Sequence, residues 1–405
     1  MTRREFLLAA PAAVSAAGCL GLDPRLLTEP RVDTAPLADA NTAFAFDLFD
    51  QLRRRPGNIF FSPFCVATSL SLAAAGADGA TRSELLHALH RGDESDPRAA
   101  GDAALQRQIA ASVAPSGCEL RSAYALWTDR GLPVHEDFRK LAQDRYAGAL
   151  QSADFGRPDA ALRSINGWTE YHTAFKIKNL LTAELPPQTR LLLSSAVYFR
   201  GVWARTFPKA TGTYGAFHAP AGQLTAPYMR QTAEYFLAEN DHAQVIEIPF
   251  AGGSLRWLMV VPRQPDGLPA VETGFNPELL RRFDDQRSMQ RVLLAMPRLR
   301  AATETKLKQP LQALGVNRAF QAPDADWSRL TGQPGLALDS IVHKAIVEVS
   351  EEGADSATAT SQAVRSAVAA RDGEAKPLAV DRPFLVVVRD AVSHSVLFLG
   401  RIEKP

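Results

Sequence analysis

The sequence predicts an α+β protein with mainly antiparallel sheets, and three observations support this prediction. Hydrophobic residues make up 46% of the 405 residues and charged residues 22%, which is enough apolar material for a sizeable core. Helical patterns dominate the first part of the chain, whereas strand-like runs dominate the later part. Strands and helices do not alternate regularly, so a parallel sheet built from βαβ units is not indicated.

The helical patterns begin close to residue 41. Asn41 is an N-cap candidate, and the apolar residues up to residue 49 are spaced to form one helix face. Residues 64–75 read as a buried helix of small residues. Thr81 and Glu84 have the spacing of a capping box, which predicts the start of a further helix.

Runs rich in β-branched and aromatic residues predict the strands. They become frequent after residue 190, which places most of the sheet material late in the chain. The expected strands are 122–127, 191–199, 245–249, 257–261, 292–296, 341–349, 384–388 and 396–399.

Residues 1–18 have the features of an export signal. Arg3 and Arg4 precede the apolar run from Leu8 to Gly18, an arrangement that resembles a twin-arginine signal. The run is too short to cross about 30 Å of hydrocarbon as a helix. We therefore expect these residues to direct export of the protein and to be removed.

Cys19 is the expected lipidation site. Ala16, Ala17 and Gly18 precede it and together resemble a lipobox, although Leu is usual at the place of Ala16, so cleavage by an ordinary signal peptidase remains an alternative. Residues 19–37 contain three prolines without a regular pattern and are expected to be a flexible tether. From these features we expect the protein to be exported and anchored by a lipid to the cell envelope, on its periplasmic or extracellular face.

Charge and cysteine content exclude several classes of protein. The 45 Lys and Arg residues nearly balance the 44 Asp and Glu residues, so the basic excess of a nucleic-acid-binding protein is missing. Three cysteines cannot form a disulfide framework, and no metal-ligand spacing is present; His87 and His90 lack further ligands nearby. No nucleotide-binding or hydrolase motif occurs either, although a triad assembled from distant residues remains open. We expect no cofactor, no metal and no enzymatic activity.

Three blocks of the chain carry a family resemblance. Each contains several residues in register, which makes the combination more specific than any single motif. The blocks are Asn58–Val66 with its continuation to Thr81, Ser195–Trp203, and Val342–Gly353 with Asp381–Arg401. The chain resembles the serpin family over residues 38–405.

The resemblance implies one domain with three β-sheets, eight or nine helices and an exposed reactive-centre loop near the C-terminus. It also implies a monomer that inhibits serine proteases as a suicide substrate. The protease cleaves the loop and forms an acyl-enzyme, and the loop then inserts into sheet A as a new strand. The alternative within the family is a non-inhibitory serpin that acts as a binding or chaperone-like protein.

The segment after Gly353 has the composition of a strand that becomes buried. With Gly353 as the hinge glycine, the inward-facing residues are small or β-branched except Gln362, whereas Asp355 and Arg365 fall on the opposite parity. A flexible linker has no reason to sort its charges in this way. The hinge implied by the resemblance comprises Glu351, Glu352, Gly353, Ala354, Asp355, Ser356, Ala357, Thr358, Ala359 and Thr360; the inward residues are Ala354, Ser356, Thr358, Thr360, Gln362 and Val364.

Two bonds compete as the site of protease attack. The family's usual spacing places the reactive bond at Ala367–Val368, and a small residue before the bond favours an elastase-like protease. Arg365–Ser366 is the alternative and would favour a trypsin-like protease.

The resemblance also assigns a shutter region under sheet A. Ser62 and His343 match the family pattern, whereas Cys65 stands where a second serine is usual and Ser195 stands where an asparagine is usual. We expect Ser195 or a water molecule to satisfy the buried polar atoms of His343.

A second region, the breach, lies where sheet A opens. Trp203 is expected to fill an aromatic position there. Arg298 and Glu351 are candidates for an ion pair in the same place.

Overall fold

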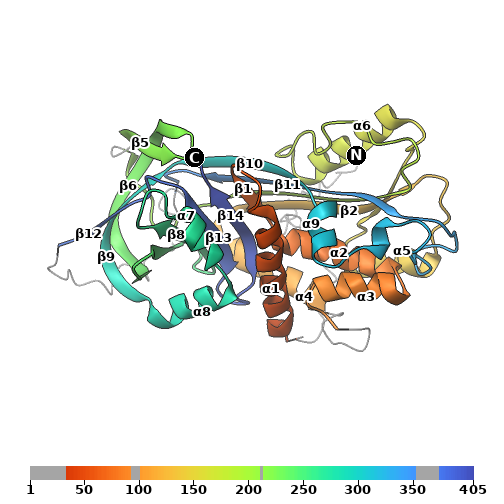
Figure 1. Cartoon of the computed structure of the whole chain (residues 1–405), viewed down its shortest axis with the longest axis horizontal. Coiled ribbons are helices and arrows are strands. Elements are labelled where there is room, and N and C mark those ends of the chain that lie inside the picture. Colours follow the sequence, from red (N-terminus) through yellow and green to blue (C-terminus); the bar gives the residue numbers. More distant parts are fainter. Residues whose placement is uncertain (1–32, 93–100, 210–212, 353–373) are drawn as a thin grey trace, which may run out of the picture.

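The computed structural model describes residues 33–92, 101–209, 213–352 and 374–405 (Figure 1). Helices prevail before residue 175 and strands after residue 190, which confirms the α+β class. None of the helices in these ranges is long and apolar enough to cross a membrane. The nine α-helices of the described ranges are α1 (Ala35–Leu52), α2 (Pro63–Gly76), α3 (Gly79–Ala88), α4 (Gly101–Val113), α5 (Glu136–Arg145), α6 (Pro158–His172), α7 (Leu268–Thr273), α8 (Pro277–Gln286) and α9 (Lys308–Ala313).

A five-stranded sheet extends along the length of the molecule (Figure 1). Its strand order is β10-β11-β4-β2-β3, and its two central neighbours, β4 and β11, run parallel and are directly hydrogen bonded. They are far apart in sequence, so no short connection ties them together. The strands are β2 (Glu119–Asp129), β3 (Leu150–Ala153), β4 (Leu191–Arg200), β10 (Leu299–Lys306) and β11 (Leu338–Val349).

The other strands form one nine-stranded network in the order β1-β14-β13-β8-β7-β6-β9-β12, with β5 paired to β6. The three expected sheets therefore correspond to two hydrogen-bonded networks in the described chain. The reason is that β6 is long enough to belong to two of the expected sheets and so joins them into one network. The N-terminal part of β6 pairs with β5 and its C-terminal part pairs with β7. The strands are β1 (Ile59–Phe61), β5 (Thr213–Ala219), β6 (Gly222–Glu239), β7 (Ala243–Pro249), β8 (Leu255–Pro262), β9 (Ser288–Pro297), β12 (Lys376–Ala379), β13 (Phe384–Asp390) and β14 (Val396–Ile402).

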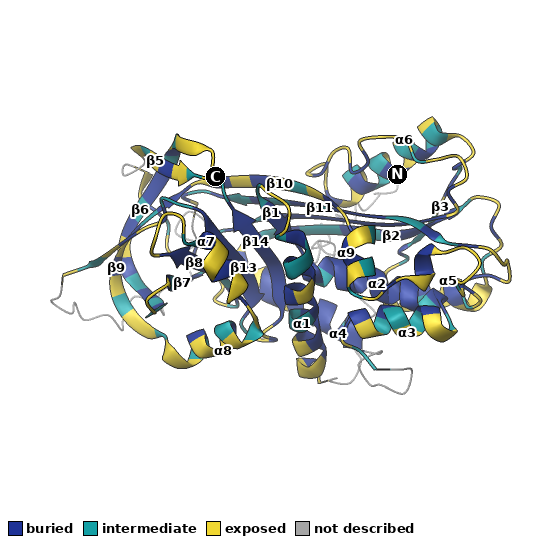
Figure 2. Ribbon diagram, in the orientation of Figure 1, coloured by how far each residue is buried: buried dark blue, intermediate teal, exposed yellow. Residues whose placement is uncertain are grey.

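Helices cover both faces of the five-stranded sheet, with α6 on one side and α2 on the other (Figures 1 and 2). Alternate residues of β4 therefore enter different cores. Leu191 and Leu193 pack in the core that contains α2, whereas Leu192 packs with Ala161 and Ile165 of α6. Because both faces are covered, nine of the ten residues of β4 are buried, and the strand reads as a continuous apolar run.

The first helix begins earlier than the sequence pattern indicated. It starts at Ala35, whose backbone N–H donates to the side chain of Asp33, and Pro36 occupies a favoured position in its first turn. Residues 35–37 are thus helical and do not belong to the tether. Asn41 is not an N-cap; it lies inside the helix, where its side chain donates to the backbone carbonyl of Val396.

The predicted capping box at the start of α3 is also wrong. The helix begins at Gly79, so Thr81 and Glu84 lie within it. The hydroxyl of Thr81 accepts a hydrogen bond from the backbone N–H of Asp326, and the carboxylate of Glu84 accepts one from that of Asn317. Both side chains satisfy backbone donors of another segment, and such tertiary partners cannot be read from local spacing.

Candidate functional site

His343 occupies the centre of the contact between β4 and β11. It is fully buried and lies opposite Ser195 in the parallel register. Its Nε2 atom accepts a hydrogen bond from the backbone N–H of Ser62 at 3.0 Å, and its Nδ1 atom is hydrogen bonded to Ser195 Oγ at 2.8 Å. The structure thus brings together the three residues expected to form the shutter.

The hydrogen bonds define the protonation state of this histidine. Because Nε2 accepts a hydrogen bond, the neutral ring carries its proton on Nδ1 and donates it to Ser195 Oγ. Burial lowers the pKa of His343 from 6.5 to about 3, since a charged imidazolium would lose its hydration. Ser195 therefore serves as the hydrogen-bonding partner that was expected to satisfy His343.

Ser62 connects this histidine to two further elements. Its side chain caps α2 by accepting from the backbone N–H of Cys65, at 3.2 Å, and it donates to the backbone carbonyl of Leu397 in β14 at 2.7 Å. The contribution of Cys65 to this network comes from its backbone. A second serine is therefore not needed for the capping interaction.

Trp203 fixes the chain where it leaves β11. The indole is fully buried, and its Nε1–H donates to the backbone carbonyl of Ser350 at 2.7 Å. The backbone N–H of Trp203 donates to the carbonyl of Glu352 at 3.0 Å. The ring stacks on Phe250 with a centroid separation of 4.7 Å and an interplanar angle of 8°. Residues 350–352 are thus attached to a rigid aromatic cluster.

Glu351 lies beside this cluster and forms the expected ion pair. Its carboxylate is nearly buried and accepts from Arg298 Nε at 2.7 Å, whereas the Arg298 side chain is about half exposed, at 47%. The backbone carbonyl of Glu351 accepts from Phe207 N–H at 3.1 Å. A buried carboxylate needs such a charged partner, because its hydration is lost.

Three residues that contribute to this region were not predicted from the sequence. Phe250 forms the stack with Trp203, and Arg200 pairs with Glu352. Gly201 makes the stack possible, since a Cβ atom there would lie 2.3 Å from the Phe250 ring. A glycine at the end of a buried strand was the one available signal for such a close approach.

Several predicted residues lie outside the described ranges. They comprise Cys19, the hinge from Gly353 to Thr360, and the two candidate reactive bonds, Ala367–Val368 and Arg365–Ser366. The described chain stops at Glu352 and resumes at Glu374. Among the residues on either side of these gaps, no group of three or more His, Cys, Asp or Glu side chains is arranged to hold a metal ion.

Comparison with known sequences identifies the family. Residues 39–405 match the family described as Serpin (serine protease inhibitor). An uncharacterized serpin-like protein of Thermococcus kodakarensis is 31% identical over 429 residues, covering 100% of this chain and 99% of the relative. Serpin B3 of Homo sapiens is 31% identical over 391 residues, covering 91% and 99%. The chain belongs to the serpin family.

Solved structures agree with this assignment. Native protease nexin-1 with heparin superimposes with a TM-score of 0.81 at 27% identity, covering 92% of this chain and 100% of that structure. Uncleaved ovalbumin has a TM-score of 0.81 at 23% identity, covering 91% and 100%, and shows the fold alone. Family membership supports inhibition of serine proteases as the general function, since serpins are mostly inhibitors and not catalysts.

Proposed function

We propose that this protein traps serine proteases as a suicide substrate, by insertion of its cleaved loop between β4 and β11. The direct parallel pairing of these two strands is the observation that carries the proposal. The chain leaves β11 at Val349 and continues to Glu352. A segment that turns back from there runs antiparallel to β11 and therefore also antiparallel to β4. One new strand can thus hydrogen bond to both neighbours once they separate.

The contacts between the two strands give the closed sheet a barrier against spontaneous insertion. Separation of β4 from β11 breaks the hydrogen bond between Ser195 and His343. It also disturbs the anchoring of residues 350–352 by Trp203. Buried polar groups that lose their partners cost about 1–3 kcal/mol each, so the sheet stays closed until cleavage frees the loop.

The inward parity of the segment after Gly353 supports insertion as well. Small and β-branched residues can pack in the core on the α2 side of the sheet. The charged Asp355 and Arg365 would lie on the α6 side, where Lys344 and Glu348 of β11 are only half-buried.

An inward charge should therefore block insertion. Thr358→Arg is expected to turn the protein into a substrate that proteases cleave without being trapped. Ala357→Arg carries the same charge on the outward parity and should leave trapping intact.

The favoured target is an elastase-like protease that cleaves Ala367–Val368, with trypsin-like cleavage at Arg365–Ser366 as the alternative. The test is incubation of the protein, produced without residues 1–19, with elastase and separately with trypsin. Denaturing gels would reveal a covalent complex, and mass spectrometry would identify the released peptide. A peptide that begins at Val368 supports the first target, and one that begins at Ser366 supports the second.

Cleavage without a complex has two explanations: the protease tested is not the target, or the loop does not insert. Thermal unfolding of the cleaved protein distinguishes them. Insertion adds a central strand to the sheet. If the loop inserts after cleavage, the cleaved protein should therefore unfold at a much higher temperature than the intact protein. A large gain would keep the mechanism and exclude only the protease tested. No gain would overturn the inhibitor proposal and favour the non-inhibitory binding or chaperone-like alternative.

We also propose that the protein is exported and anchored to the cell envelope through a lipid on Cys19. The signal-like residues 1–18 and the lipobox-like residues before Cys19 support this proposal. Mass spectrometry of the N-terminal peptide should find a lipidated Cys19 as the first residue. A mature chain that begins elsewhere, or an unmodified Cys19, would overturn the anchor.

A further inference from the structure

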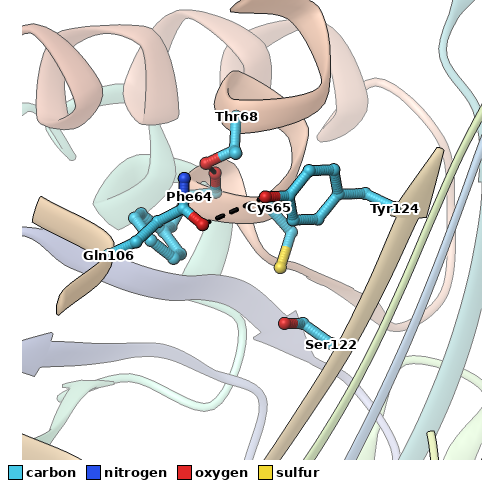
Figure 3. A pocket seen from close by; sticks show the side chains of 6 residues that line it. All are labelled: Phe64, Cys65, Thr68, Gln106, Ser122 and Tyr124. Atoms are coloured by element: carbon cyan, nitrogen blue, oxygen red, sulfur yellow. Dashed lines mark hydrogen bonds between the residues drawn. The ribbon is translucent and has the colours of Figure 1, made fainter. Parts of the chain in front are cut away.

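A small hollow lies between α2, α4 and β2 (Figure 3). Its cavity volume is about 10 Å³, which is the room that a single water molecule needs. The hollow is therefore too small for an organic ligand. The residues that line it are Phe64, Cys65 and Thr68 of α2, Gln106 of α4, and Ser122 and Tyr124 of β2.

Gln106 directs a buried polar group into this hollow. The side chain of Gln106 is 7% exposed, and its Oε1 atom accepts a hydrogen bond from the Tyr124 hydroxyl at 3.0 Å (Figure 3). Its Nε2 atom is buried and has no hydrogen-bond partner among the described residues. If the amide is turned around, the oxygen becomes the end without a partner. A buried amide end that stays unpaired is costly, so this position calls for a small polar partner.

Two hydroxyl groups complete the polar lining. Thr68 Oγ1 donates to the Phe64 carbonyl at 2.8 Å, so its oxygen is left to accept a further hydrogen bond. The Ser122 hydroxyl extends from β2 into the hollow (Figure 3). Burial raises the pKa of the neighbouring Cys65 thiol to about 12, which keeps this thiol neutral. The hollow thus offers one amide end and two hydroxyls, and a buried water typically makes about three hydrogen bonds.

We propose that one water molecule is held in this hollow and bridges α4 and β2 to α2. It accepts a hydrogen bond from Gln106 Nε2 and donates to the hydroxyl oxygens of Thr68 and Ser122. Water fits the site whichever way the amide is turned, because it can both donate and accept. An ion would lose its hydration here, since none of the lining side chains carries an opposite charge.

The bridge crosses the boundary along which the sheet opens, a consequence that rests on the proposed function. β2 is paired with β4, where Tyr124 lies opposite Ser195. α2 is held on the side of β11, since its N-cap Ser62 is hydrogen bonded to His343 and to the carbonyl of Leu397 in β14. When β4 leaves β11, β2 follows β4 whereas α2 stays with β11. The hydrogen bonds of the water then break, which adds to the barrier against spontaneous opening.

Crystal structures of the full chain and of two matched variants test the site. The unchanged protein should show one water within hydrogen-bonding distance of Gln106 and Thr68. Gln106→Met removes the amide at similar length and should lose the water. Tyr124→Phe is the control, because it removes the same hydrogen bond between Gln106 and Tyr124 but leaves the amide; it should keep the water.

A third variant keeps the test open if Gln106→Met does not fold. Ser122→Val removes one hydroxyl and fills the hollow with a methyl group, so it should displace the water. A dry hollow in the unchanged protein would overturn the proposal. A water that persists in folded Gln106→Met or Ser122→Val would overturn it as well.

The rate of spontaneous conversion tests the role of the bridge. On warming without protease, Gln106→Met should convert to latent or polymeric protein about fivefold faster than Tyr124→Phe, the change expected from the loss of one hydrogen bond. Native gels over time measure both rates. Equal rates would show that the water does not hold the boundary closed. A failure to trap proteases would leave the water in the crystals unchanged, so the two failures are distinguishable.

Discussion

Ser195 of β4 and His343 of β11 lie directly opposite each other, and their side chains form a buried hydrogen bond of 2.8 Å across the parallel strand pair. The other ring nitrogen of His343 accepts from the backbone of Ser62, which caps α2. One side chain therefore connects two strands of the five-stranded sheet to the helix beneath them. Any separation of β4 from β11 has to break or rearrange this connection.

Replacement of His343 by alanine should destabilise the closed sheet. The backbone N–H of Ser62 and the hydroxyl of Ser195 lose their partner inside the core, at a cost of about 1–3 kcal/mol each. We expect a lower free energy of unfolding in urea. We also expect faster spontaneous conversion to latent or polymeric protein on warming, measured by native gels over time.

His343→Asn is the control for this substitution. Asparagine offers both a donor and an acceptor, so it should retain part of the network and convert more slowly than the alanine variant. If His343→Ala converts at the rate of the unchanged protein, the histidine is only a packed core residue and the barrier lies elsewhere.

Acid should destabilise the protein through the same histidine. Its pKa is about 3 in the folded protein and about 6.5 when it is exposed on unfolding, so the unfolded state binds the additional proton between these values. The stabilising contribution is complete above about pH 6.5 and is lost as the pH falls towards 3. Between pH 7 and pH 5 the loss is about 2 kcal/mol.

The pH effect is measured as the difference between two proteins in urea unfolding. His343→Asn cannot titrate in this range, so its free energy of unfolding should fall less between pH 7 and pH 5 than that of the unchanged protein. Parallel pH profiles for the two proteins would show that another group causes the acid sensitivity.

The sequence predicted the class of fold and part of the site for identifiable reasons. The continuous apolar run of β4 and the late position of the strands follow directly from burial on both faces of a sheet. Ser62, Ser195 and His343 could be named because each lies within a block that resembles the family. Their hydrogen bonds could be stated only as an expectation, since they depend on the register between β4 and β11.

Contacts between distant segments account for what the sequence could not reveal. Asn41 has the residue type of an N-cap, but its side chain instead donates to the backbone of Val396 in another part of the chain. The stack of Phe250 on Trp203 likewise joins two segments without a local pattern that links them. Local preference is a weak guide wherever a tertiary partner offers a better hydrogen bond or a larger contact.

Gly201→Ala should disrupt the aromatic cluster that Trp203 and Phe250 form. The new Cβ atom would lie 2.3 Å from one carbon of the Phe250 ring and 2.9 Å from the next, and this ring is buried against Trp203. The ring has to move and the stack is lost, so we expect destabilisation by about 2–3 kcal/mol. Urea unfolding and the near-UV circular dichroism of the tryptophans would measure the change.

Two variants test the cause of this effect. Gly167→Ala is the matched control, because the new Cβ atom in α6 meets nothing within 4 Å and should be neutral or stabilising by up to about 1 kcal/mol. Phe250→Leu combined with Gly201→Ala should recover part of the loss, since the smaller side chain makes room. If the two substitutions change the free energy of unfolding by strictly additive amounts, Gly201 and Phe250 do not act on each other.

Phe175 carries backbone strain that a single substitution should relieve. Its φ angle is +62°, and its ring is 65% exposed just beyond the end of α6, so little burial offsets the cost of the left-handed conformation. Glycine adopts this conformation freely, and Phe175→Gly should raise the free energy of unfolding by about 0.5–1 kcal/mol. Phe175→Ala removes the same ring but keeps a Cβ atom, so it should gain nothing. Equal stabilisation by glycine and alanine in urea unfolding would place the cost in the exposed ring and not in the backbone.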